Sequence, residues 1–80
     1  MEIKVLGPGC PKCHTLEKTV REVLAETGIV AEVKKITGIK EIAAHGIMLT
    51  PGLIINGKIK STGKVLSKSE VQKYIEQERK

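Results

Sequence analysis

The sequence predicts a small α/β domain whose elements follow the order β-α-β-α-β-β-α. Three observations predict this order. An apolar segment, an amphipathic helical pattern and a second apolar segment follow one another from residue 2 to residue 36, as in a βαβ unit. Asn56-Gly57 separates two apolar runs, as in a two-residue hairpin. Ser67 and Glu70 form a capping box before a last amphipathic segment. Eighty residues make one small domain, so we expect residues 1–80 to fold as a single unit.

The first strand and the first helix are predicted from the apolar pattern of the N-terminal third. Residues 2–6 are apolar and partly β-branched, and the strand they predict ends in a tight loop at Gly7-Pro8-Gly9. In the helix that follows, the apolar positions recur at helical spacing: Leu16, Val20, Val23, Leu24 and Thr27. Pro11 suits the first helical position, where its missing N–H costs nothing, and Gly28 suits the position just after the helix.

The middle of the chain predicts a second strand at residues 29–36 and a short helix at residues 38–46. Gly46 is the expected stop of this helix. The residues expected on its inner face are Ile39, Ile42 and Ala43.

The C-terminal part predicts a hairpin at residues 53–60 and a last helix that begins after Ser67. Leu66 and Val71 are spaced as a hydrophobic staple across the start of that helix. Its inner face should be Val71, Tyr74 and Ile75. The βαβ unit should be parallel and right-handed, with the hairpin extending the sheet antiparallel. We therefore expect a four-stranded mixed sheet flanked by three helices, which cover its apolar faces.

Composition narrows the possible functions. The net charge is +5, but lysines alternate with glutamates and no block of like charge stands out, so nucleic-acid binding is not expected. Tyr74 is the only aromatic residue, which argues against stacking on bases or flat cofactors. No apolar run has the length of a transmembrane helix, and the N-terminus does not resemble a signal peptide. We expect a cytoplasmic monomer that does not bind membranes, and in that compartment a close cysteine pair is catalytic or metal-binding.

Cys10-Pro11-Lys12-Cys13 is the main candidate site. With Pro11 at the first helical position, Cys10 is the N-cap, where free amide groups and the helix dipole favour a thiolate. Lys12 and protonated His14 would add positive charge, so we expect the pKa of Cys10 to lie below that of a free cysteine. Cys13 continues the apolar stripe and should face inward. Cys10 is therefore the candidate attacking thiol, and Cys13 the resolving thiol.

Thr50-Pro51 is a second signal, directly before the predicted hairpin. Proline is tolerated as the first residue of a strand, and base rates favour the trans isomer.

Taken together, the C-x-x-C motif after the first strand, the element order and Thr50-Pro51 resemble the thioredoxin fold. The nearest group is that of small thioredoxin- and glutaredoxin-like redox-active disulfide proteins, and the resemblance covers essentially the whole chain. It implies a cis bond at Thr50-Pro51 and substrate binding through the backbone of Thr50. It also implies a redox-active Cys10–Cys13 disulfide as the only redox group, protein disulfides or a small disulfide as substrates, and a flavoprotein reductase as electron donor. The chain differs from thioredoxins, which have Trp at Gly9 and a buried Asp at Lys4, and from glutaredoxins, which have an aromatic residue at Lys12.

Two alternative functions remain open. Cys10, Cys13 and His14 offer three zinc ligands, although no fourth is evident nearby, so a metal-binding or metal-transfer protein is possible. The same residues satisfy the C-x-x-C-H motif of c-type haem attachment, with Met48 as an axial ligand. The scarcity of aromatic residues and the predicted hairpin oppose the haem alternative.

Overall fold

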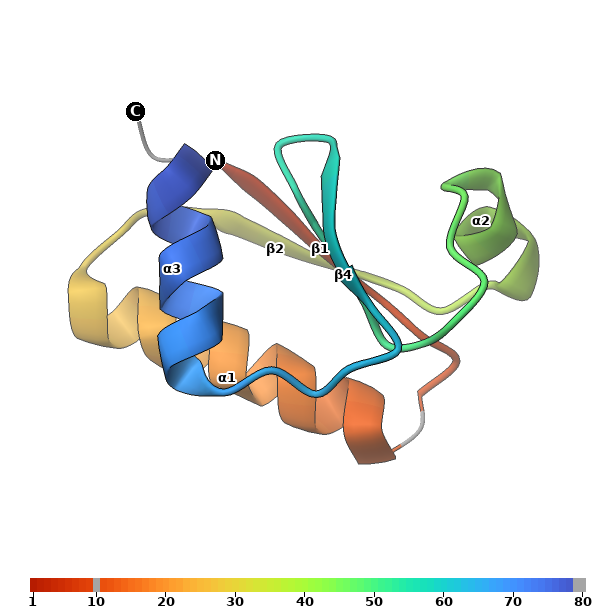
Figure 1. Ribbon diagram of the computed structural model, residues 1–80, viewed down its shortest axis with the longest axis horizontal. Coiled ribbons are helices and arrows are strands. Elements are labelled where there is room, and N and C mark those ends of the chain that lie inside the picture. Colours follow the sequence, from red (N-terminus) through yellow and green to blue (C-terminus); the bar gives the residue numbers. More distant parts are fainter. Residues whose placement is uncertain (10, 79–80) are drawn as a thin grey trace.

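A computed structural model describes residues 1–9 and 11–78. Its elements are β1 Glu2–Leu6, α1 Pro11–Thr27, β2 Glu32–Ile36, α2 Ile39–Ala44, β3 Gly52–Ile55, β4 Lys58–Thr62 and α3 Lys68–Glu78. In this described part of the chain the predicted order, with one four-stranded mixed sheet and three helices, is confirmed (Figure 1).

The sheet has the strand order β2-β1-β3-β4. β1 pairs in parallel with β2 and antiparallel with β3, so the hairpin extends the sheet as predicted. Asn56 and Gly57 have φ angles of 52° and 80°, which gives the hairpin its tight turn. The Asn56 side chain also accepts a hydrogen bond of 3.0 Å from the Glu2 amide, so the turn is held against the start of β1.

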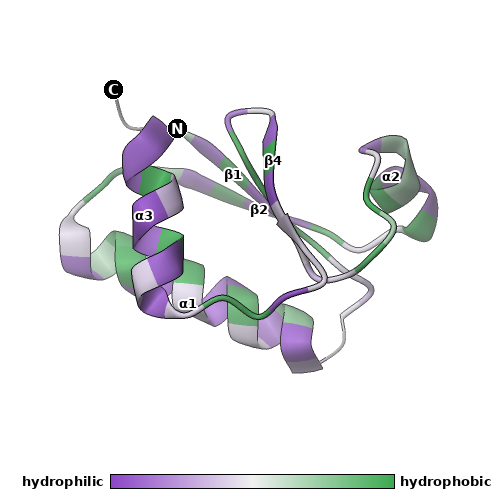
Figure 2. Cartoon of the chain, in the orientation of Figure 1, coloured by the Kyte–Doolittle hydropathy of each residue, from purple (hydrophilic) through white to green (hydrophobic). Residues whose placement is uncertain are grey.

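The main core lies between the sheet and the two long helices. Figure 1 shows α1 and α3 on the same side of the sheet, and Figure 2 shows apolar residues along both. Side chains that alternate along β1 and β3 meet the apolar faces of both helices. The residues of this cluster are Ile3, Val5, Leu16, Val20, Val23, Leu53, Ile55, Leu66, Val71 and Ile75. The stripe predicted for α1 is therefore what anchors that helix.

The opposite face of the sheet carries a smaller cluster of Leu6, Ile42, Ile47 and Ile54. Of the three residues predicted to face inward from α2, Ile42 is buried, but Ile39 is 77% exposed and Ala43 is exposed. The prediction was wrong for these two because α2 has only six residues, so a single position faces the sheet. Ile47, just after the helix, completes the cluster.

The second strand is shorter than predicted, since residues 29–31 precede it. β1 begins at Glu2 and pairs there with Glu32, so the earlier residues have no strand beside them. The Glu32 amide donates to the Met1 carbonyl at 2.9 Å, which marks the start of the pairing. Val30 is consequently 91% exposed.

Side-chain interactions hold both ends of α3 in place. At its start the Ser67 amide donates to Glu70 and the Glu70 amide donates to the Ser67 hydroxyl, each at 3.3 Å, which confirms the capping box. At its end the Glu78 carboxylate binds Lys60 at 2.9 Å and Lys58 at 3.4 Å, both from β4. The hydrogen bond from Lys60, supported by Lys58, lowers the pKa of Glu78 below its ordinary value of 4.5.

The lowered pKa of Glu78 makes the stability contributed by its ion pairs depend on pH. A carboxyl whose pKa is lower in the folded state stabilises the fold above its unfolded pKa of 4.5, and this contribution is lost as the pH falls through the folded value. Glu78→Gln and Lys60→Met should each reduce the loss of unfolding free energy below pH 4.5, measured by urea titration at several pH values. Wild-type pH dependence in both variants would contradict this assignment.

Because Val5 is buried and Val30 is exposed, replacing each with alanine should lower the free energy of unfolding by different amounts. Val5 is 1% exposed in the main core, whereas Val30 is 91% exposed. Val5→Ala should lower the free energy of unfolding by about 2 kcal/mol, because it removes buried methyl groups and leaves a cavity. Val30→Ala should change it by no more than about 0.5 kcal/mol. Urea unfolding measures both, and equal costs would refute the placement.

Candidate functional site

The cysteine motif lies where β1 gives way to α1. Cys10 is outside the described residues, so its N-cap position, its exposure and its pKa stay predictions. Pro11 is the first residue of α1, as predicted, and the exposed Lys12 and His14 lie in its first turn. This turn contains no acidic residue that would oppose the positive end of the helix dipole.

Cys13 is buried, with 1% of its surface exposed, as its place in the apolar stripe of α1 predicts. Its sulfur lies against the backbone of Gly7, because a Cβ atom at Gly7 would overlap Cys13 Sγ and lie 3.0 Å from Cys13 Cβ. The Gly7 amide donates to the Ile36 carbonyl at 2.8 Å, which fixes this backbone segment to β2. Gly7 is thus a positioning residue, which sequence reasoning treated only as part of a turn.

Thr50-Pro51 lies beside this contact. The bond is cis, as the resemblance implies and contrary to the base-rate expectation of trans. The position of a Cβ on Gly7 is 3.8 Å from Thr50 Cβ, so Thr50 and Cys13 meet around the same glycine. Pro51 is buried, and its carbonyl accepts a hydrogen bond of 2.9 Å from Gly63. The fold therefore brings the two predicted signals together.

An apolar groove of about 310 Å³ lies next to Thr50. Its walls come from the loop after β1, from α2 and from the segment that leads to Pro51: Pro8, Ile39, Ile42, Ala43, Ile47, Met48 and Thr50. Ile39 is 77% exposed and Met48 is 95% exposed along this groove. From the sequence, Met48 suggests only a haem ligand, because its place in the groove depends on the position of α2.

His14 is part of a network of charged side chains rather than an isolated cation. Its Nδ1 atom lies 3.3 Å from the Lys35 ammonium group, within hydrogen-bond distance. Lys35 also pairs with Glu17 at 3.3 Å, and Glu17 pairs with Arg21 at 3.1 Å. Partial burial opposes ionisation of Glu17, but hydrogen bonds from Arg21 and Lys35 lower its pKa overall. The cation at this position is Lys35, which the sequence did not identify.

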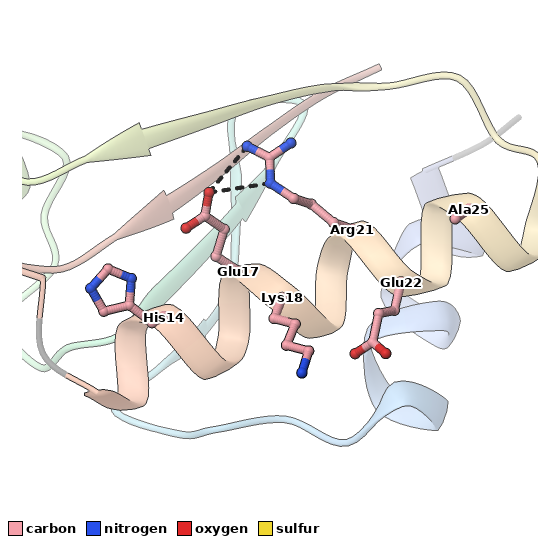
Figure 3. Close-up of a pocket in the computed structure, with 6 residues that line it drawn as sticks. All are labelled: His14, Glu17, Lys18, Arg21, Glu22 and Ala25. Carbon is pink, nitrogen blue, oxygen red and sulfur yellow. Dashed lines mark hydrogen bonds and ion pairs between the residues drawn. The ribbon is translucent and has the colours of Figure 1, made fainter.

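A second hollow, of about 420 Å³, runs along the outer face of α1 (Figure 3). His14, Glu17, Lys18, Arg21, Glu22 and Ala25 line it. All six come from one helix, and the visible contact is the Arg21–Glu17 ion pair. It is open surface of a solvated helix, so the groove beside Thr50 is the better candidate for a bound segment.

Lys4, which stands where thioredoxins have a buried acid, lies on the α2 face of the sheet. Ile3 and Val5 on either side of it belong to the main core, which places Lys4 on the opposite face. It contacts His45 Nε2 at 3.4 Å and Glu2 at 3.7 Å. Its ammonium group is therefore engaged with that face and does not lie in the core beneath Cys13.

Metal-ligating residues do not gather in the described structure. Among residues 1–9 and 11–78, no three His, Cys, Asp or Glu side chains lie close enough to hold one ion. Cys10 lies outside this search. None of the described helices has the length and apolar character needed to cross a membrane.

A C-x-x-C motif at the start of the helix of a βαβ unit, with a cis-proline beside the second cysteine, defines the class of dithiol–disulfide proteins with the thioredoxin fold. Residues 1–76 match the thioredoxin domain family. A thioredoxin of Methanothermobacter thermautotrophicus is 41% identical over 75 residues, covering 94% of this chain and 97% of the relative. A thioredoxin of Methanocaldococcus jannaschii is 37% identical over 78 residues, covering 92% and 90%. The chain belongs to the thioredoxin family and is a thiol–disulfide oxidoreductase.

The contact between Gly7 and Cys13 gives a testable coupling. Gly7→Ala should lower the free energy of unfolding by about 1–3 kcal/mol, because the new methyl group overlaps Cys13 Sγ. In a Cys13→Ala background the same change should cost measurably less, because the sulfur is gone. Urea unfolding of the four proteins measures the coupling. Gly38→Ala is the matched control, since its new methyl group meets only the Glu41 side chain, at 3.3 Å from the flexible Oε1 atom and at ordinary contact distances of 3.8 and 3.9 Å from Cγ and Cβ. An equal cost of Gly7→Ala with and without the sulfur would disprove the contact.

Proposed function

We propose that the protein is a protein-disulfide reductase that carries two electrons on the Cys10–Cys13 pair. The observation that carries this proposal is the burial of Cys13 against Gly7, next to the cis bond at Thr50-Pro51. A buried second cysteine suits the resolving role, because a bulky substrate cannot reach it before the first cysteine has reacted. Cys10, which directly precedes α1, is then the attacking thiol.

The reaction proceeds in two exchanges. The Cys10 thiolate attacks one sulfur of the substrate disulfide, forms a mixed disulfide and expels the first substrate thiolate. Cys13 then loses its proton to solvent and attacks Cys10 Sγ, which forms the Cys10–Cys13 disulfide and expels the second substrate thiolate. Both substrate thiolates take protons from water. The substrate gains two electrons and the protein loses two, so an external reductant must restore the dithiol.

The surroundings support a reactive thiolate at Cys10. The first turn of α1 carries no acidic side chain, and its helix of 17 residues directs its positive end toward the residue before Pro11. The exposed Lys12 in the same turn adds positive charge. These groups favour the anion over the neutral thiol, which lowers a cysteine pKa and raises the thiolate population.

The groove beside Thr50 supports the binding of a protein segment. Its apolar walls suit a side chain next to the substrate disulfide, and Thr50 is the expected site of backbone hydrogen bonds to an extended segment. For the electron donor we propose a flavoprotein reductase, and for the compartment the cytoplasm, where dithiols stay reduced. We expect the protein to act as a monomer without nucleic acid, since many of its lysines are engaged with glutamates and form no basic stripe.

Single cysteine variants test the two roles. Cys13→Ser should abolish turnover of a protein disulfide and accumulate a mixed disulfide at Cys10, because no thiol remains to release the substrate. Cys10→Ser should abolish turnover without accumulating an adduct. Mass spectrometry without reductant, with an insulin-reduction assay, gives both readouts. A pair that never oxidises in a defined thiol buffer, in a protein purified with stoichiometric zinc, would favour metal binding instead.

A further inference from the structure

We propose that the redox end of the protein selects partners whose disulfide is flanked by acidic residues as well as by an apolar side chain. The proposal rests on the proposed function and concerns its specificity. The selecting feature is a set of three exposed lysines in segments next to the groove, the cis-proline or the cysteine motif: Lys12, Lys40 and Lys64, which we term the basic rim.

The three rim lysines differ in their pairing from the lysines of the sheet and of the start of α3; Lys18 and Lys73 also lack an ion pair with the described residues, but neither lies in α2, in the loop after β4 or between the cysteines. Lysines of the sheet and of the start of α3 form ion pairs with glutamates: Lys34 with Glu2, Lys35 with Glu17, Lys60 with Glu78 and Lys68 with Glu26. The three lysines of the basic rim form no ion pair with any described residue. Their charge is therefore not compensated within the described part of the fold.

The placement of the rim follows from its neighbours. Lys40 follows Ile39, which lines the groove. Lys64 follows Gly63, whose amide donates to the Pro51 carbonyl at 2.9 Å. Gly63 also lies against Leu49, since a Cβ on it would be 3.0 Å from Leu49 Cβ. The two lysines thus belong to the segments that border the groove and the cis-proline.

Lys12 lies between the two cysteines, so the third cation of the basic rim is in the motif itself. Two acidic residues belong to the elements that carry rim lysines, Glu41 in α2 and Glu17 in α1. Glu41 is next to Lys40 in α2, and its Oε1 atom lies near Gly38. Glu17 in α1 is already held by Arg21 and Lys35. The redox end therefore presents a surplus of positive charge beside an apolar groove.

An apolar groove alone does not discriminate strongly between partner proteins. The uncompensated lysines of the basic rim can discriminate between partners by the charge beside the partner's disulfide. A partner with carboxylates beside its disulfide would be attracted to the rim, while a basic partner would be repelled. Steering of this kind changes association rates by about 10- to 1,000-fold and falls with ionic strength. Because the screening length is about 8 Å at physiological salt, the effect should act on residues close to the substrate disulfide.

Three synthetic peptides test the preference. Each carries the same intramolecular disulfide and the same leucine beside it, flanked by glutamates, serines or lysines. The measurement is the second-order rate constant for oxidation of the reduced protein. At low salt the glutamate peptide should react at least about tenfold faster than the lysine peptide, and the ratio should shrink toward one above about 0.5 M salt. Equal rates at low salt would overturn the inference.

Charge-reversal variants test whether the preference for acidic peptides comes from the basic rim or from the net charge of the protein. Lys40→Glu and Lys64→Glu should each lower the glutamate-to-lysine rate ratio several-fold at low salt. Lys73→Glu is the control, because Lys73 is an exposed lysine of α3 that has no ion pair with the described residues, and its reversal changes net charge equally. It should leave the ratio near the wild-type value. If all three variants lower the ratio equally, net charge alone decides and the rim is refuted.

Failure of the underlying function gives a different result. The neutral disulfide of 2-hydroxyethanethiol carries no flanking charge, so its reduction depends only on the cysteine pair. If the reduced wild-type protein oxidises with neither this disulfide nor any peptide, the proposed reductase function fails. If it reduces this disulfide and treats the peptides alike, only the basic rim fails.

Discussion

The packing of the apolar stripe of α1 on β1 is the contact on which the rest of the structure depends. Leu16, Val20 and Val23 bury this stripe against the sheet, and Cys13 is its first member. The interaction that stabilises the helix therefore also sets the rotation of the cysteine motif. Because the stripe is hydrophobic, the Cys13 thiol is buried away from water, whereas Pro11 and Lys12 at the start of the helix are exposed.

Gly7 connects that stripe to the Thr50-Pro51 segment. It is bound to β2 through Ile36, it leaves room for the sulfur of Cys13, and it approaches Thr50. A side chain here would separate Cys13 from the cis-proline segment or displace one of them. The small size of one residue at the end of a strand thus permits the meeting of segments that are far apart in the chain.

Two acidic residues hold elements of the fold together. Glu78 ties α3 to β4, and Glu17 ties α1 to β2 through Lys35. The position where thioredoxins have a buried acid is occupied by Lys4, which is engaged with Glu2 and His45 on the other face. The first turn of α1 carries no acidic side chain, so the positive end of its dipole is not offset there, which is the basis of the proposed thiolate and of the proposed anionic partner.

The sequence by itself determined the element order, the start of α1 at Pro11, the inward direction of Cys13 and the turn at Asn56-Gly57. These features depend on spacing, caps and turn chemistry within a few residues, so a single segment contains the information. The tertiary structure decided the short α2, the groove, the Lys35–His14 contact and the role of Gly7. Each of these depends on which segments the sheet register brings side by side, and local patterns do not encode that register. The cis isomer of Thr50-Pro51 belongs fully to neither group. The general frequency of cis X-Pro bonds favours trans, and only the resemblance of the whole chain to a known fold predicted cis.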